Sequence, residues 1–300
     1  MAMNLKQVLL AVAASAALSA CASDIPAAPK EVAEVWPRTA WETPPPAPLS
    51  VGSPRASTFA GGLKLREPFY SNQQLHQNFL AIAMRAEAAD DVDLAGNITV
   101  AKWVKPLRYQ LVGATREDAA RVASLATRVQ RLTGIDIAPA DALEPNVRVS
   151  FVPFRHRDNA IFQLTDQGTL GPAVRGLVMR WRDTEREKCL GLISVDPKSG
   201  AIGKTDILIK NELPPTIRNA CIVEEIVQSL GLMNDVPHAR PSIFNDSQEF
   251  LDLTTHDEFL LRILYDPRVR PGMTLRMMRP LVAQIIREVR PSTGPTRAGT

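Results

Sequence analysis

Residues 221–246 read CIVEEIVQSLGLMNDVPHARPSIFND and begin with the pattern of a packed helix. Apolar side chains recur there at helical spacing: Ile222, Val223, Ile226, Val227 and Leu230. Pro214 and Pro215 favour a helix start just upstream, because a first-turn proline loses no hydrogen bond. Gly231 is a typical helix end. We therefore predict a helix from about residue 215 to residue 230.

The polar residues of this helix are the first candidates for chemistry. Glu224 and Gln228 are one turn apart and share a face, whereas Glu225 is rotated by about 100° from Glu224. The chain beyond the helix adds three further polar groups: Asn234, Asp235 and His238. A solvated helix face, or a structural hydrogen-bonding pair, would explain Glu224 and Gln228 without any chemistry.

The spacing resembles the extended zinc-protease motif HExxHxxGxxH of the zincin metallopeptidases. Glu225 takes the place of the catalytic glutamate, the candidate general base, and Gly231 that of the turn glycine. Other residues stand where the three histidine ligands would be: Glu224, Gln228, and Asn234 or Asp235. Ser242-Ile243-Phe244 resembles the methionine turn under such a metal, with Phe244 in place of methionine.

A larger resemblance covers about residues 70 to 290. The segment is similar to the domain-of-unknown-function family 2927 of proteobacterial secreted proteins, a family regarded as distantly related to zincins. The similarity lies in Cys221-x-x-Glu-Glu-x-x-Gln-x-Leu-Gly-Leu, in Asn234-Asp235, and in LTTHDEFLLRILYDPRVRPGM at 253–273. It implies a zincin-like domain with an active-site-type helix followed by C-terminal helices.

The missing histidines argue against a conventional zinc centre. Zinc prefers imidazole and thiolate, and a carboxamide such as that of Gln228 is a poor ligand. We expect an inactive scaffold that serves as a binding or envelope-assembly module, a pseudoenzyme without a resident cofactor. Two alternatives stay open. Glu224, Asp235 and Glu225 could bind a divalent metal that prefers oxygen ligands, such as calcium, magnesium or manganese. His238 could then contribute one nitrogen ligand. Alternatively, Glu224 and Glu225 could act as the acid and base of a metal-free hydrolase.

The N-terminal sequence predicts export of the chain to the bacterial envelope. Residues 1–21, MAMNLKQVLLAVAASAALSAC, combine Lys6 with an uncharged stretch too short to span a bilayer, as in a secretory signal. Leu18-Ser19-Ala20-Cys21 resembles a bacterial lipobox, which implies cleavage before Cys21 and its lipidation, including a palmitate chain. Ala22 and Ser23 then favour the outer over the inner membrane. A plain secretory signal is the alternative.

Composition divides the rest of the chain. Residues 22–64 are rich in proline and predict a disordered tether, residues 65–290 predict a single domain, and residues 291–300 predict a disordered tail. The net charge of +3 gives no indication of a nucleic-acid partner. We expect contact with the membrane through the lipid, and with an envelope protein or peptidoglycan. The arginines at 262–290 leave contact with anionic lipid or cell-wall polymer open.

Three cysteines remain to be assigned among these roles. If Cys21 carries lipid, Cys189 and Cys221 are most simply a disulfide in an oxidising periplasm. Metal ligation by these two is the alternative. The disulfide would close a loop of about 33 residues and contribute roughly 3–4 kcal/mol.

Elsewhere the chain alternates helical and strand patterns. Helices are predicted over 71–88, 115–134, 255–265 and 277–289, with caps at Ser71, Thr115 and Gly134. Strands are predicted within 100–112, over 147–152, and as a pair, 189–195 and 202–209, around the turn 196–200. Strands in the first half and helices toward the end predict an α+β domain with a mixed or antiparallel sheet, not a doubly wound parallel one.

Overall fold

The computed structural model describes residues 9–11, 56–58, 64–84, 99–141, 143–165, 172–245 and 250–290. The predicted signal peptide and tether fall largely outside these ranges, and Cys21 and the predicted tail lie entirely outside them. Late in the segment predicted to be a tether, β2 (Ala56–Thr58) pairs antiparallel with β3 (Lys64–Arg66). The proline-rich composition gave no indication of this ribbon.

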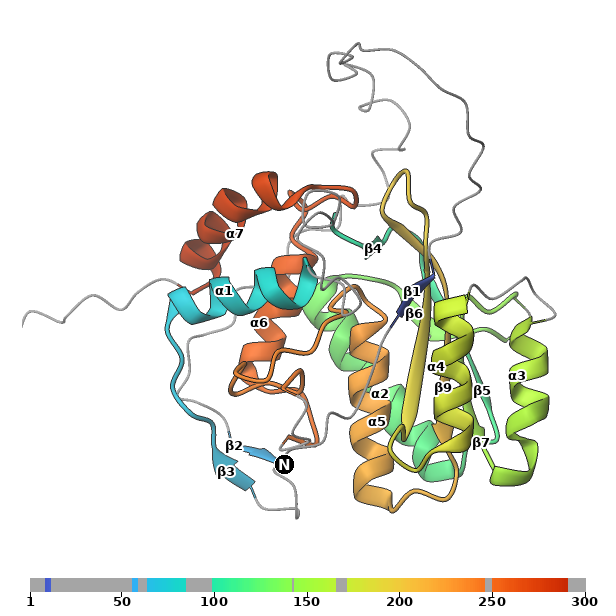
Figure 1. The fold of residues 1–300 in the computed structure, drawn as a ribbon. Coiled ribbons are helices and arrows are strands. Elements are labelled where there is room, and N and C mark those ends of the chain that lie inside the picture. Colours follow the sequence, from blue (N-terminus) through green and yellow to red (C-terminus); the bar gives the residue numbers. More distant parts are fainter. Residues whose placement is uncertain are drawn as a thin grey trace, which may run out of the picture.

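A mixed sheet forms the centre of the domain (Figure 1). Its strands are β1 (Leu9–Ala11), β4 (Lys102–Trp103), β5 (Leu107–Val112), β6 (Ile137–Pro139), β7 (Val147–Val152), β8 (Cys189–Val195) and β9 (Ala201–Lys210). The order is β1-β8-β9-β7-β5-β6, with β4 beside β9. Because β1 lies within the predicted signal peptide, cleavage before Cys21 would remove this strand and leave β8 at the edge of the sheet. The strands β9, β7, β5 and β6 run parallel, whereas β8 is antiparallel to β9, as predicted for the pair around residues 196–200.

The domain is therefore of mixed α/β type, which differs from the α+β prediction. The mixed sheet and the β8–β9 hairpin are confirmed, but most strand pairs are parallel. Parallel neighbours need a crossover. One crossover is α2 (Arg116–Thr133), which links β5 to β6. The other contains α3 (Arg157–Thr165) and α4 (Pro172–Asp183), which precede the β8–β9 hairpin and which we did not predict.

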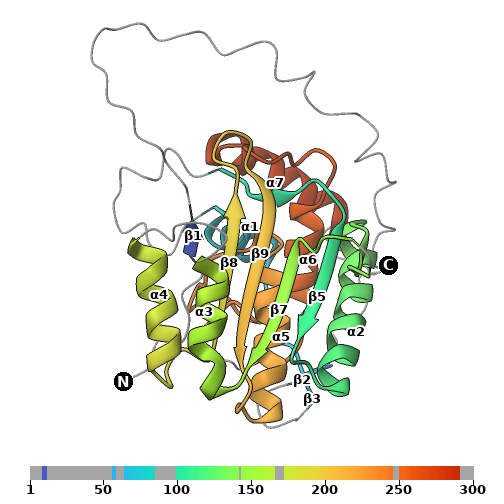
Figure 2. The same cartoon turned by 90° about the vertical axis from the view of Figure 1, so that its right-hand side faces the viewer.

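Helices cover both faces of the sheet (Figures 1 and 2). On one face, α2 and α5 (Pro215–Gln228) pack over Val149 and Ile207. On the other, α4 packs over Leu208 and its neighbours through Trp181. Because successive strand residues point to opposite faces, Ile207 and Leu208 belong to different halves of the core.

Three more helices form a layer beyond α2 and α5. They are α1 (Asn72–Ala83), α6 (Thr255–Leu264) and α7 (Leu275–Val289), and they contact one another. Ser71 caps α1 and Thr115 caps α2, each in a capping box, and Gly134 ends α2 with φ 74°. These caps confirm the predicted starts of both helices and the predicted end of α2, although α1 ends at Ala83 rather than at residue 88.

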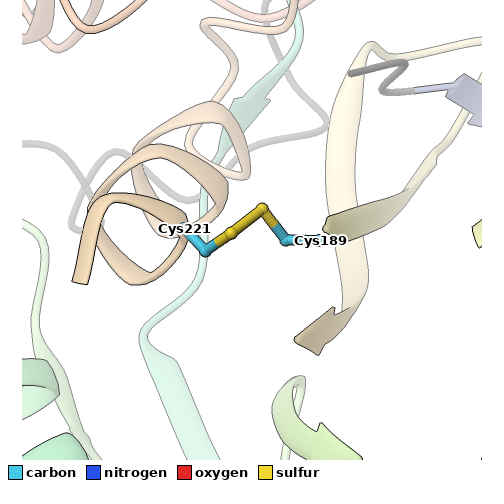
Figure 3. The surroundings of a disulfide bond; sticks show 2 residues. All are labelled: Cys189 and Cys221. Atoms are coloured by element: carbon cyan, nitrogen blue, oxygen red, sulfur yellow. A yellow bond between two sulfur atoms is a disulfide. The ribbon is translucent and has the colours of Figure 1, made fainter. Parts of the chain in front are cut away.

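The predicted disulfide is present and joins the two central elements of the candidate site. Cys189 at the start of β8 is bonded to Cys221 on α5, with 5.9 Å between their Cα atoms (Figure 3). Both residues are buried. The covalent link therefore fixes α5 against the antiparallel strand of the sheet.

Candidate functional site

Helix α5 carries the central candidate residues, and side chains from distant segments hold its C-terminal end. The indole Nε1 of Trp103 donates to the carbonyl of Ser229 at 2.8 Å, and the Tyr265 hydroxyl donates to the carbonyl of Leu230 at 2.7 Å. Burial raises the pKa of Tyr265 well above its ordinary value, so the phenol keeps the proton that it donates. The last turn of α5 is thereby anchored.

Gly231 has a steric reason to be glycine. Its φ is 115°, and a Cβ there would lie 2.1 Å from the carbonyl oxygen of Ala101. An L-residue would be strained at this φ and would collide with the backbone. The glycine of the motif is thus required by the close approach of the segment leading into β4.

Glu225 faces the sheet. It is buried, with 1% of its surface exposed, and it lies one turn beyond the disulfide-bonded Cys221. Opposite stands Gly191 of β8, where a Cβ would come 2.8 Å from Oε2 of Glu225. Sequence reasoning missed Gly191, although a lone glycine inside an apolar strand indicates close approach of another group.

Glu224 and Gln228 are buried as well, so they are not a solvated helix face. Gln228, with no exposed surface, donates from Nε2 to Oδ1 of Asp235 at 3.0 Å. The structural hydrogen-bonding interpretation therefore holds for Gln228, but its acceptor is Asp235 rather than Glu224.

Asn234 and His238 lie apart from that pair. Asn234 donates from Nδ2 to the carbonyl of Ala81 at 2.9 Å, and from its backbone N–H to that of Ile82. It thereby links the chain after α5 to the end of α1. His238 is exposed. The structure thus pairs Gln228 with Asp235, turns Glu225 toward β8 and leaves His238 at the surface.

The segment predicted to resemble a methionine turn is held by Asp257. Oδ1 of Asp257 accepts from the Ser242 hydroxyl at 2.6 Å, and Oδ2 accepts from the Ile243 N–H at 3.1 Å. Phe244 is fully buried beneath this turn. Asp257 also completes the capping box of Thr254 at the start of α6. The Thr-x-x-Asp spacing could have revealed the cap, but not the second role of Asp257.

Comparison with known proteins shows the family of the chain. A family model described as "Protein of unknown function (DUF2927)" matches residues 72–284, well over half of the chain. The chain belongs to the DUF2927 family. Neither a curated protein nor a solved structure gives a significant match. The match covers α1, the central sheet from β4 onward, α5 and most of α7.

The residues of this DUF2927 domain do not fit a zincin metal centre. The first ligand position is a glutamate and the second a carboxamide that is hydrogen-bonded to Asp235. The third is either Asn234, which bonds to α1, or Asp235, whose Oδ1 accepts from Gln228. Among the residues that the structure describes, no group of three or more His, Cys, Asp or Glu side chains could hold a metal ion.

No helix in the described ranges of the DUF2927 chain is long and apolar enough to span a membrane.

Proposed function

We propose that this DUF2927 protein is a lipid-anchored module on the periplasmic side of a bacterial envelope. Its domain is a degenerate zincin-like scaffold that binds an envelope partner instead of hydrolysing one. A single observation carries the non-catalytic part: Gln228, in the place of a zincin ligand, is buried and hydrogen-bonded to Asp235. The Oε1 atom of Gln228 has no hydrogen-bond partner among the described residues, but a carboxamide is a poor zinc ligand, so the motif positions do not supply a conventional ligand set for zinc.

The order of elements supports the zincin-like scaffold. A strand, a helix and further strands precede the motif-bearing α5, as the resemblance implies. Gly231 makes the tight turn after α5, and the Ser242–Phe244 turn follows with a buried aromatic residue. The helix, the glycine turn and the turn that follows thus match the arrangement of the zincin motif, whereas the residues at its ligand positions differ.

The hydrolase alternative has less support. A general base must reach a water and a substrate at about 3 Å. The carboxylate of Glu225 is buried between α5 and β8 and faces the backbone of Gly191. A carboxylate in that environment is more consistent with a structural role than with a general base that reaches a substrate from solution.

Two features support attachment in the envelope. The lipobox-like Leu18–Cys21 sequence and the proline-rich segment behind it fit an anchored, tethered domain. The disulfide between Cys189 and Cys221 fits an oxidising compartment. Ala22 and Ser23 favour the outer membrane. Envelope proteins and peptidoglycan are the partners that this location offers.

Hydrolysis assays test the non-catalytic assignment. The full chain, Glu225→Gln, and the control Glu117→Gln, at an exposed position of α2, are incubated with an unfolded protein and with purified peptidoglycan. We expect no hydrolysis above blank from any of the three, together with cosedimentation of all three with a partner-containing envelope fraction. Hydrolysis by the native chain and the control, but not by Glu225→Gln, would establish the alternative.

Labelling in cells tests the anchor separately. Radiolabelled palmitate should enter the native chain and Ser23→Ala, but not Cys21→Ala, and the labelled protein should fractionate with membranes. A native chain that is exported without label would identify a plain secretory signal instead.

A further inference from the structure

Helix α7 presents three arginines on one exposed stripe. It buries Met278, Val282, Ile285 and Ile286 against the rest of the domain. Arg276, Arg279 and Arg287 are exposed. At 100° per residue, these three positions fall within about 80° of one another around the helix. We call them the arginine stripe.

No ion pair among the described residues neutralises the charge of this stripe, although Glu288 interacts electrostatically with Arg287. Residues 262–290 contain seven arginines and only two acidic residues, Asp266 and Glu288. Arg268 binds both, at 2.8 Å and 2.6 Å. No carboxylate within the described part of the chain forms an ion pair with Arg276, Arg279 or Arg287. Three guanidinium groups are therefore left for an external anion.

An exposed apolar residue lies beside the stripe. Pro280 is about 40° from Arg276 and about 20° from Arg287 around α7. The exposed Met277, by contrast, is about 160° from Arg279 and lies off the stripe. Guanidinium groups bind phosphate in a bidentate manner, and a neighbouring apolar side chain can enter the headgroup region. This combination fits a phospholipid surface better than a purely polar cell-wall polymer.

The position of α7 fits the same partner. It lies at one end of the molecule, away from the sheet (Figure 1). Its C-terminal end lies beside the segment that leads from β3 into α1: Arg290 donates to the carbonyl of Tyr70 at 2.9 Å, and Asn72 donates to that of Arg290 at 3.3 Å. A chain arriving from a membrane anchor would thus pass α7 after the β2–β3 ribbon and after Glu67, which accepts from the Thr255 N–H at the start of α6.

We infer that the arginine stripe of α7 rests on an anionic phospholipid surface, with Pro280 beside the headgroups. The inference rests on the proposed envelope attachment and deepens it, because it orients the domain on the membrane. On an anionic bilayer, each arginine of a basic helix face raises the membrane partition coefficient of the protein by about fivefold.

Vesicle flotation of the full chain with Cys21→Ser, which removes the lipid, tests the inference. Binding is compared on phosphatidylglycerol–phosphatidylcholine vesicles and on pure phosphatidylcholine. Replacing the stripe (Arg276→Gln, Arg279→Gln, Arg287→Gln) should lower the phosphatidylglycerol-dependent binding on the order of a hundredfold. The control triple Arg116→Gln, Arg131→Gln, Arg175→Gln removes the same charge from exposed sites on α2 and α4. It should change binding by less than about twofold.

A probe at residue 280 gives a second readout. An environment-sensitive fluorophore on Pro280→Cys should shift its emission to the blue on anionic vesicles, and one on the exposed Leu143→Cys should not. Equal loss in both triples, or no shift at residue 280, would overturn the inference. So would binding to peptidoglycan sacculi, but not vesicles, that depends on the stripe. Palmitate labelling at Cys21 reports on the anchor independently, so the two proposals can fail separately.

Discussion

Gln228 donates a hydrogen bond from Nε2 to Oδ1 of Asp235 over 3.0 Å, and its side chain is fully buried. In the zincin motif that α5 resembles, the residue at this position would hold the metal. Here its Nε2 donates to a carboxylate of the same chain, while its Oε1 is buried without a hydrogen-bond partner among the described residues. The Gln228–Asp235 hydrogen bond can be perturbed directly.

Gln228→Glu should destabilise the domain in a pH-dependent way. A carboxyl group facing Asp235 in a buried site would have its pKa raised in the folded state. The loss in free energy of unfolding is therefore small below about pH 4, where glutamate is ordinarily protonated. It grows with rising pH and reaches about 2 kcal/mol at neutrality. Urea unfolding at about pH 4 and at about pH 7 measures this loss.

Helix α7 provides the matched control for this change. Gln284 also donates to a carboxylate at 3.0 Å, that of Glu288, but it is exposed. Gln284→Glu should cost only a few tenths of a kcal/mol at either pH. Equal effects at residues 228 and 284 would show that burial of the Gln228–Asp235 pair is unimportant.

Gly191→Ala should destabilise the domain by about 1–3 kcal/mol, because the new methyl group would meet the buried carboxylate of Glu225. Gly203→Ala on β9 has nothing within 4 Å and should be nearly neutral. In a double-mutant cycle, Glu225→Ala should relieve much of the cost at residue 191. Additive effects would mean that the two residues do not touch.

Removing the disulfide should lower stability by roughly 3–4 kcal/mol, from the loop that it closes in the unfolded chain. The change is Cys189→Ala with Cys221→Ala, measured by urea unfolding without reductant. Because both sulfurs are buried, added reductant should not affect the folded native chain until denaturant opens it. Rapid reduction in the absence of urea would contradict the packing of α5 on β8.

Lys102 should make stability rise with pH in the alkaline range. Burial lowers its pKa to about 8, with Asp266 opposing the change. Between about pH 8 and the ordinary lysine value of about 10.4, the unfolded chain binds more protons, so alkali favours the folded state. Lys102→Met should remove up to about 3 kcal/mol of this rise.

Urea unfolding at pH 7.5, 8.5 and 9.5 would record the effect of Lys102. Lys198→Met, at an exposed turn, is the control and should keep the slope of the native protein. A slope that is the same in Lys102→Met and in the native chain would show that Lys102 is not desolvated.

Local signals in the sequence predicted much of the fold. The capping boxes at Ser71 and Thr115, the hairpin turn at 196–200 and the stripe of α5 are short-range patterns. The parallel sheet was missed because α3 and α4 were missed. The spacing of Val174, Leu177, Val178 and Trp181 carried the helical signal of α4.

The candidate site was less predictable, because its contacts join residues far apart in sequence. Glu225 faces Gly191, and Asn234 bonds to Ala81, at separations that no periodicity encodes. The polar residues of α5 suggested a solvent-exposed face. The sequence of a helix alone does not show whether neighbouring layers cover it on both sides. The pair Cys189–Cys221 was predictable only from cysteine count and compartment.

The metal content of the protein distinguishes structural polar residues on α5 from a metal site. The full chain, purified without chelators, is analysed for zinc, calcium, magnesium and manganese by elemental mass spectrometry. We expect far less than one equivalent of any of them, unchanged in Glu224→Ala and in Asp235→Ala. One tightly held equivalent in the native protein, lost in those variants, would contradict this expectation and would make this domain a metal enzyme scaffold with an altered ligand set.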